Sequence, residues 1–262
     1  MNRALIDTIE NQCTAYYQPI VDLETGRVVG FEALTRIRGN DGAVSSPGTF
    51  IDEIEDDVDI LTALMRQILY TVSIDMVPLF THYPDFYVSI NIPPVVLGTG
   101  RIMDIMHELQ MMPYIKRLVV EVTERQSLTA LGREALERVN ANGIRIAIDD
   151  FGTGNSGIEQ IAGLDLDILK IDNALIRPVL AHRTSARMLR GIVALASALH
   201  MHTIAEGVET WEQAFFMRAA GVDYGQGWYW SKALPVDAVE QALNTGFANS
   251  SASTGGCAPE YP

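Results

Sequence analysis

The chain has 262 residues, of which 48% are hydrophobic, and its formal net charge is −14. This apolar content suffices for a large core and excludes a globally disordered chain. The acidic balance argues against DNA binding through a broad basic surface, but it permits a small phosphorylated ligand where metal ions reverse the local field.

No apolar run reaches the roughly 20 residues that span a bilayer. The first residues also lack the apolar region and cleavage site of a signal peptide. We therefore expect a cytoplasmic protein without membrane insertion. Cys13 and Cys257 are the only cysteines, which excludes a disulfide framework and a cysteine metal site.

The N-terminal part is expected to open with a hairpin. Its predicted elements are a helix over 1–12, strands over 15–23 and 27–36, a loop over 37–47 and two helices between 47 and 77 that break near Asp56. Glu24–Gly26 fits a tight turn between the two strands, which makes the first strand antiparallel to the second.

Six strand–helix units are expected to follow. The strands are predicted at 86–92, 118–123, 144–150, 166–171, 202–206 and 224–229. The helices are predicted at 94–111, 128–142, 156–163, 183–200, 211–220 and 236–245. With the hairpin these make eight strands, the number of a closed TIM-like (β/α)8 barrel with an antiparallel first strand. A doubly wound open sheet is the alternative. One barrel domain over 1–246 and a disordered tail over 247–262 are expected.

The most informative stretch is Ile144–Asn155, where an apolar strand ends in Asp149 and Asp150 and a glycine-rich turn follows. Ionised carboxylates are costly to bury, so the strand does not need them for packing. At the C-terminal end of a barrel strand, such a pair is placed to hold a metal ion or a reacting group. The alternative is that the two aspartates only end the strand and cap the next helix.

Polar side chains also alternate with apolar ones on the neighbouring predicted strands. Because residues two apart share one face of a strand, this alternation sorts the side chains into two sets. The set expected to point into the barrel at its C-terminal rim is Asn91, Glu121, Asp149 and Lys170. Matching positions of the second, seventh and eighth strands hold Glu32, Glu206 and Gln226.

If these side chains converge, five carboxylates crowd one cleft around Lys170. At an effective dielectric near 20, each like-charge contact at about 4 Å costs roughly 4 kcal/mol, which one lysine cannot offset. Either several carboxyl groups are protonated, or divalent cations lie among them. Ligands that are all oxygen suit Mg²⁺ or Mn²⁺, and two ions sharing Asp149 would activate a water for hydrolysis of a phosphate ester.

The same residues occur in motifs that resemble those of the EAL-domain cyclic di-GMP phosphodiesterases, over residues 13–240. The motifs run, in chain order, Tyr17–Asp22, Glu32–Leu34, Ser89–Asn91, Glu121–Glu124, Asp149–Gly154, Leu169–Asp172, Ala205–Thr210 and Gln226–Gly227. Each motif alone is weak evidence, but together, in this order and at strand ends, they are highly specific.

The resemblance implies cleavage of one phosphodiester of cyclic di-GMP to give linear pGpG, with two Mg²⁺ or Mn²⁺ ions in the site. It implies metal ligation by Glu32, Asn91, Glu121, Asp149, Asp150 and Glu206, and a catalytic set of Lys170, Glu206 and Glu32. It implies substrate contacts from Gln18, Leu34, Arg36 and Gln226. Thr123, Glu124 and Glu209 would support the site, with Glu124 anchoring the Asp150–Gly154 loop, and the chain would form a homodimer.

Some positions depart from the family pattern. Ile37 stands where tryptophan is usual, Asn155 replaces an aromatic residue and Gly157 replaces a serine. The first bears on how a base packs, and the other two bear on the loop that couples dimerisation to catalysis. Trp228 and Trp230 are expected to pack on the barrel, with stacking on guanine as the alternative.

Other functions remain open from the residues. A catalytically silent cyclic di-GMP receptor is the main alternative, although no proposed metal ligand and no proposed lysine is missing. A protein-interaction module would have no use for the carboxylate cluster. An enolase-like barrel with Mg²⁺ and a lysine base fits less well, because of Gln18, Asn91 and the second acidic set. A regulatory protein partner is a further possibility.

Overall fold

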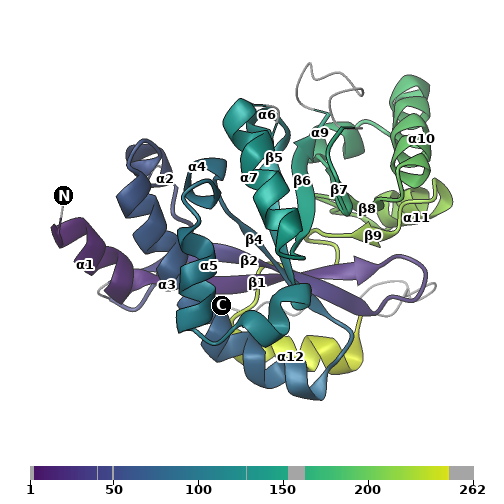
Figure 1. Ribbon diagram of the computed structural model, residues 1–262. Coiled ribbons are helices and arrows are strands. Elements are labelled where there is room, and N and C mark those ends of the chain that lie inside the picture. The colour runs from purple at the N-terminus through teal and green to yellow at the C-terminus, as the bar shows by residue number, and fades with distance from the viewer. Residues whose placement is uncertain (1–2, 40, 49, 128, 153–162, 248–262) are drawn as a thin grey trace.

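The computed structural model describes residues 3–39, 41–48, 50–127, 129–152 and 163–247. Its strands are β1 (Cys13–Asp22), β2 (Val28–Arg38), β3 (Val44–Ser45), β4 (Tyr87–Asn91), β5 (Leu118–Thr123), β6 (Arg145–Phe151), β7 (Ile168–Ile171), β8 (His202–Ala205) and β9 (Tyr224–Gly225). These strands form the centre of the molecule, and most of the helices lie outside them (Figure 1).

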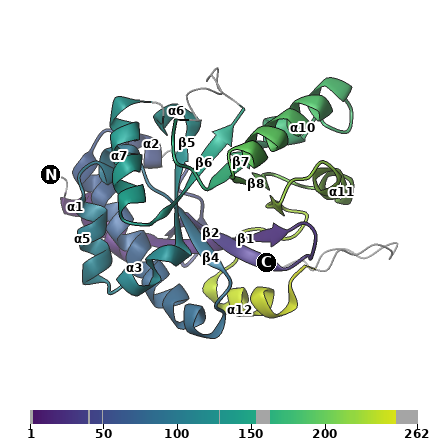
Figure 2. The ribbon, with the colours of Figure 1, turned by 45° about the vertical axis from the view of Figure 1, so that its right-hand side comes forward.

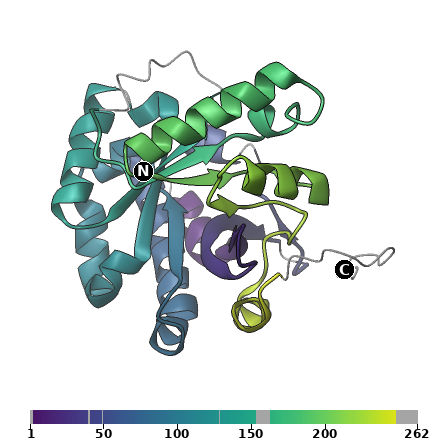
Figure 3. The ribbon, with the colours of Figure 1, turned by 90° about the vertical axis from the view of Figure 1, so that its right-hand side faces the viewer.

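The helices account for most of the remaining described chain. They are α1 (Arg3–Gln12), α2 (Phe50–Ile54), α3 (Val58–His82), α4 (Pro94–Leu97), α5 (Arg101–Glu108), the 3₁₀ helix η1 (Met112–Arg117), α6 (Glu124–Ser127), α7 (Ala130–Ala141), α9 (Asn173–Ile176), α10 (Arg183–Ala198), α11 (Trp211–Ala219) and α12 (Val236–Thr245). The long helix α3 and the short helix α5 pack against each other on one side of the barrel (Figure 2). Helices α10 and α11 lie side by side on another (Figure 3).

The sheet closes on itself, which confirms the barrel and rules out the open-sheet alternative. Strand β1 pairs antiparallel with both β2 and β9, and every other neighbour in the ring β2-β4-β5-β6-β7-β8-β9 is parallel. The two-residue strand β3 adds to the outer edge of β2 and is not part of the ring. The antiparallel first strand is therefore as expected.

Two apolar layers hold the barrel together. The outward-facing residues of the strands join the buried faces of the helices in one large core. A second, smaller cluster fills the barrel interior below the C-terminal rim, and it consists of Ile20, Tyr87, Val119, Ala147, Ile168 and Ile204. A Cβ atom on Gly30 would lie 2.7 Å from Cζ of Tyr87, so glycine there lets the ring fill the interior. The inward-pointing polar side chains of the strands therefore lie at the rim, above this apolar cluster.

Helix α3 is long and apolar enough, by length and composition, to cross a membrane. In the fold it packs against α1, α4, α5, β1 and β2, and its apolar face is buried among them. It therefore has the contacts of a core helix. A buried core helix can be as long and as apolar as a helix that crosses a membrane.

Several predicted boundaries were wrong. Residues 37–47 are not all loop, because Ile37 and Arg38 extend β2 and pair with β3. The single helix expected over 94–111 is broken at Gly98–Gly100, since Gly100 has a φ of 76°. The last barrel strand is only Tyr224–Gly225, because the chain then turns. The predicted helix at 156–163 falls almost wholly outside the described residues, as do Asn155, Gly157 and most of the predicted tail.

Candidate active site

A fully buried lysine lies at the centre of the C-terminal rim. The Nζ atom of Lys170 is 2.6 Å from a carboxylate oxygen of Glu121, 2.8 Å from one of Glu206, 3.3 Å from one of Asp149 and 3.4 Å from one of Glu32. These carboxylates come from β5, the end of β8, β6 and β2, respectively. Four strands separated in sequence thus place their acidic residues around one ammonium group, as the alternation of side chains predicts.

Two amides connect the cluster to its surroundings. Nδ2 of Asn91 donates to Glu32 at 2.8 Å and to Glu121 at 3.4 Å, which leaves the carbonyl oxygen of Asn91 for another partner. Nε2 of Gln226 donates to Glu32 at 2.7 Å and to Gln18 at 3.2 Å. Glu32 therefore has its carboxylate oriented from three sides.

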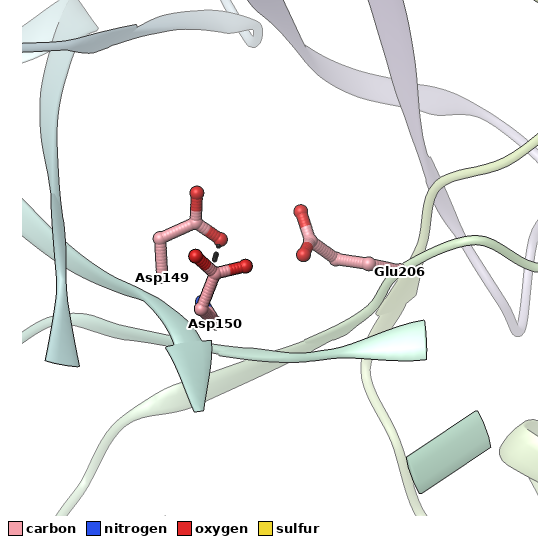
Figure 4. A group of neighbouring side chains, drawn as sticks. All are labelled: Asp149, Asp150 and Glu206. Carbon is pink, nitrogen blue, oxygen red and sulfur yellow. Dashed lines mark hydrogen bonds between the residues drawn. The ribbon is translucent and has the colours of Figure 1, made fainter. Parts of the chain in front are cut away.

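Asp150 reaches the site through a distortion of β6. The register between β6 and β7 shifts between Ile148 and Phe151, and Asp150 has a φ of 57°. Aspartate tolerates this left-handed conformation better than most residues. In a regular strand Asp149 and Asp150 would point to opposite faces. Here carboxylate oxygens of Asp149, Asp150 and Glu206 lie within 4.8 Å of one another (Figure 4).

The electrostatics of the cluster reflect its crowding. Burial, together with the charge of Glu32, raises the pKa of Glu121 to about 8, against the opposing effect of Lys170. Burial also raises the pKa of Glu206 well above its usual value, and burial and the charge of Asp149 raise the pKa of Asp150. Burial alone would lower the pKa of Lys170, but the surrounding carboxylates raise it well above its usual value.

These residues fit a site for hard divalent cations. One positive charge faces four carboxyl groups, of which those of Glu32 and Glu121 are buried and those of Asp149 and Glu206 are partly buried. Burial and the neighbouring negative charges raise the pKa values of Glu121 and Glu206. One oxygen of Glu121, Oε1, is buried and accepts no hydrogen bond within the described residues. Oxygen ligands without cysteine or histidine suit Mg²⁺ or Mn²⁺.

Four further predicted residues lie near the cluster, two at a neighbouring cavity and two farther along β2. Gln18 and Glu209 both line the cavity beside the cluster. Leu34 and Arg36 follow Glu32 on the same face of β2 but lie beyond it. Both are half-buried, and Arg36 donates to the carbonyl oxygen of Thr35. Burial lowers the pKa of Arg36, with Glu32 acting in the opposite direction.

Glu124 is buried and accepts a hydrogen bond from the backbone N–H of Gly152 at 3.3 Å. Gly152 belongs to the segment that Glu124 was predicted to anchor, whose later part lies outside the described residues. Thr123 pairs with Asp149 in the register of β5 and β6, and its hydroxyl accepts from the N–H of Gln126. The supporting roles of these two residues stay predictions.

Some residues of the cavity were not predicted from the sequence as site residues. They are Asp172, Asn173, Arg177, Gly207, Gly227 and Trp228. The alternation that selects Lys170 also selects Asp172 two residues later, so that signal was present. The position of Trp228 was predicted wrongly, because its side chain is 67% exposed and lines the cavity. Trp230 does pack on the barrel, against Gly225.

Comparisons with known proteins agree with this arrangement. The model of the EAL domain family matches residues 2–233. The probable cyclic di-GMP phosphodiesterase PdeB of Escherichia coli K12 is 35% identical over 237 residues, which cover 88% of this chain and 45% of PdeB. The chain thus spans less than half the length of this curated relative.

Solved structures show the same fold. A cyclic di-GMP complex of the PaMucR phosphodiesterase is 27% identical, with a TM-score of 0.80 over 90% of this chain and 98% of that one. An EAL domain protein from Listeria monocytogenes EGD-e is 30% identical, with a TM-score of 0.75 over 93% of this chain and 98% of that one.

Proposed function

The chain belongs to the EAL domain family, and from this premise we propose that it is a metal-dependent phosphodiesterase that hydrolyses cyclic di-GMP to linear pGpG. The observation that carries the proposal is the convergence of Glu32, Glu121, Asp149 and Glu206 on the buried ammonium of Lys170. The printed name of the relative PdeB, probable cyclic di-GMP phosphodiesterase, supports the choice of substrate.

In the proposed site, two Mg²⁺ or Mn²⁺ ions would be held by a shared set of oxygen ligands. The set comprises Glu32, Asn91, Glu121, Asp149, Asp150 and Glu206. When bound, such ions polarise a phosphate oxygen and lower the pKa of a water molecule, which makes a nucleophile at neutral pH. The acidic triad at Asp149, Asp150 and Glu206 supports this assignment.

The residues of the chain have distinct tasks in the reaction. The ammonium of Lys170 is fixed by its carboxylate partners, so it can orient the attacking water and stabilise the negative charge that develops on phosphorus oxygens. Glu206 and Glu32 complete the catalytic set. Hydrolysis adds one water across a P–O bond, with its oxygen bonded to phosphorus and a proton passing to the ribose oxygen that leaves.

Substrate binding is assigned to four residues around the cavity. Gln18 and Gln226 are joined by a hydrogen bond, and both line the cavity. Leu34 and Arg36 extend along β2 from Glu32, and the planar guanidinium of Arg36 suits a phosphate or a guanine edge. The proposal also includes one catalytic domain over 1–246, a homodimer and a cytoplasmic location.

The direct test is incubation of the purified protein with cyclic di-GMP and either Mg²⁺ or Mn²⁺, with chromatographic detection of pGpG. We expect one equivalent of pGpG per cyclic dinucleotide and no product in excess EDTA. Tight binding of cyclic di-GMP without turnover in either metal would instead identify a receptor. Light scattering coupled to size exclusion measures the oligomeric state.

A further inference from the structure

Helices α10 and α11 carry a basic and aromatic outer face that the proposed reaction does not use. Residues 173–205 contain four arginines and neither an aspartate nor a glutamate, in a chain whose net charge is −14. Three of these arginines, Arg183, Arg187 and Arg190, lie on α10. A local excess of positive charge in so acidic a chain indicates a binding surface for an anionic partner.

The three arginines form one stripe along α10. Their spacing of four and then three residues places them on the same side of the helix. The buried residues Leu189, Ile192 and Ala196 lie on the opposite side, toward the barrel. All three arginines are exposed, and none forms a salt bridge with a carboxylate among the described residues. Their guanidinium groups are therefore available to an external anion.

An exposed aromatic pair lies on the neighbouring helix α11. Trp211 and Phe215 are 48% and 61% exposed, and their rings stack with centroids 5.6 Å apart and an interplanar angle of 8°. They lie four residues apart, on the side of α11 opposite the buried Gln213 and Met217. Burial of large apolar rings releases free energy, so the pair favours a partner with an apolar layer.

The arginine stripe and the aromatic pair belong to one continuous face. Helices α10 and α11 lie side by side on the outside of the barrel (Figure 3). The guanidinium of Arg190 lies over the ring of Phe216, 5.8 Å from its centroid, and a Cβ atom on Gly221 would lie 3.6 Å from Cγ1 of Val193. Because both helices turn their buried sides to the barrel, the arginines and the aromatic pair point outward together.

The chemistry of this face fits an anionic lipid surface. Arginines bind lipid phosphates, while tryptophan and phenylalanine enter the boundary between headgroups and acyl chains. Single-stranded nucleic acid fits less well, because the two rings stack on each other and leave fewer faces for bases.

The acidic residues of the chain reduce the attraction to such a surface only in part. Glu212, exposed beside Trp211, is the one acidic residue of α11, and α10 has none. It offsets one of the three arginines. Charges on the far side of the barrel act weakly, since a Debye length at physiological ionic strength is about 8 Å.

We propose that the α10–α11 face docks the protein peripherally onto anionic lipid membranes: the arginine stripe binds lipid phosphates, and Trp211 and Phe215 enter the interface beneath the headgroups. Such docking requires no membrane-spanning segment. The inference goes beyond the proposed function and involves neither metal ions nor cyclic di-GMP. Vesicle binding and hydrolysis can therefore succeed or fail independently of each other.

The test is sedimentation of the purified protein with lipid vesicles in the presence of EDTA. Phosphatidylcholine vesicles with about 30% phosphatidylglycerol should bind the wild type, and vesicles of phosphatidylcholine alone should not. Replacement of all three arginines by glutamine should weaken binding by about fivefold per arginine, roughly a hundredfold in total. Trp211→Gln combined with Phe215→Gln should weaken it by at least about tenfold. Binding should also fall as NaCl rises from about 50 mM to about 500 mM.

Tryptophan fluorescence gives a second readout of the same contact. Addition of anionic vesicles should shift the emission of the wild type to shorter wavelengths, because the indole of Trp211 leaves water. Trp211→Phe keeps two stacked rings, so it should still bind the vesicles and should lose this shift.

The matched control replaces three other arginines by glutamine, namely Arg66, Arg101 and Arg138. Their salt bridges lie at the surface on α3, α5 and α7 rather than on α10. This variant changes the net charge by the same amount and should bind anionic vesicles within about twofold of wild type. The circular dichroism spectra of all variants should match that of the wild type, because the substituted positions are exposed.

Three results would overturn the inference. The first is that the wild type does not bind anionic vesicles at low salt, and the second is that the control loses binding as much as the α10 variant. The third is a change in oligomeric state of the α10 or α11 variant, measured by light scattering, which would place this face between copies of the chain. Tighter binding of a single-stranded oligonucleotide than of anionic vesicles would likewise contradict a lipid partner.

Discussion

The Nζ atom of Lys170 lies 2.6 Å from Oε2 of Glu121, and neither side chain has any exposure to solvent. An ammonium group and a carboxyl group in so dry a place stabilise each other through a hydrogen bond, and the further carboxylates around the lysine add to this. Removal of the lysine leaves the carboxyl groups around it without a compensating positive charge. Lys170 is therefore expected to matter for both stability and catalysis. The ammonium group proposed to act in the reaction also offsets part of the negative charge of the carboxylates around it.

Replacement of this lysine should destabilise the metal-free protein at neutral pH. We expect Lys170→Met to lower the free energy of unfolding by about 3–5 kcal/mol, as for other broken buried pairs, and to abolish turnover. Burial already raises the pKa values of Glu121 and Glu206 above their usual values, and without the ammonium they rise further. The deficit should therefore shrink as pH falls toward 5, where these groups hold protons in the folded state. Urea unfolding at pH 5 and pH 7.5 measures this, and an equal deficit at both would contradict it.

Substitution of a proposed metal ligand should weaken metal binding and abolish activity without unfolding the barrel. Glu32→Ala removes a proposed ligand and the acceptor for Asn91 and Gln226, so it should abolish formation of pGpG and weaken Mn²⁺ binding by at least about tenfold. Glu108→Ala serves as the control, because Glu108 is exposed and its salt bridge with Arg66 lies at the surface. Full activity of Glu32→Ala would refute the ligand assignment.

Metal affinity should depend on pH through Glu121. Burial raises its pKa to about 8, so below that pH the metal-free protein holds a proton that a divalent cation must displace. The affinity for Mg²⁺ should rise by up to roughly tenfold per unit between pH 6.5 and 8 and then level off. Calorimetric titration in two buffers of different ionisation enthalpy should show proton release at pH 7 that disappears near pH 9. Affinity that is flat over this range would argue against ligation by Glu121.

The thiol of Cys13 should report on unfolding of the barrel. Cys13 begins β1, is 4% exposed and has a pKa raised by burial to about 11, so its reactive thiolate is scarce at neutral pH. In a Cys257→Ser background, a chromogenic disulfide reagent should label Cys13 rapidly in urea and only very slowly in native buffer. Fast native labelling would mean that the first strand opens readily, contrary to its two pairing partners in the closed ring.

Much of the architecture follows from local patterns in the sequence. Alternating polarity placed Asn91, Glu121, Asp149 and Lys170 on one face of their strands, and the structure brings all four together. This worked because the period of a strand is a local property, and because the C-terminal ends of parallel strands in a barrel meet at one rim. The assignment of metal ligation and catalysis to these residues stays a prediction for the experiments above.

Other features depended on contacts between distant segments. A regular strand would have separated Asp149 from Asp150, and only the bulge against β7 brings Asp150 beside Glu206. Trp228 and Trp230 have the same local signal, yet the contact of Gly227 with Val208 exposes one at the cavity while the other packs on Gly225. The residues alone determined which side chains carry charge and which face of each strand they share. Barrel closure and its irregularities, which depend on partners far away in the chain, decided how near those side chains come to one another.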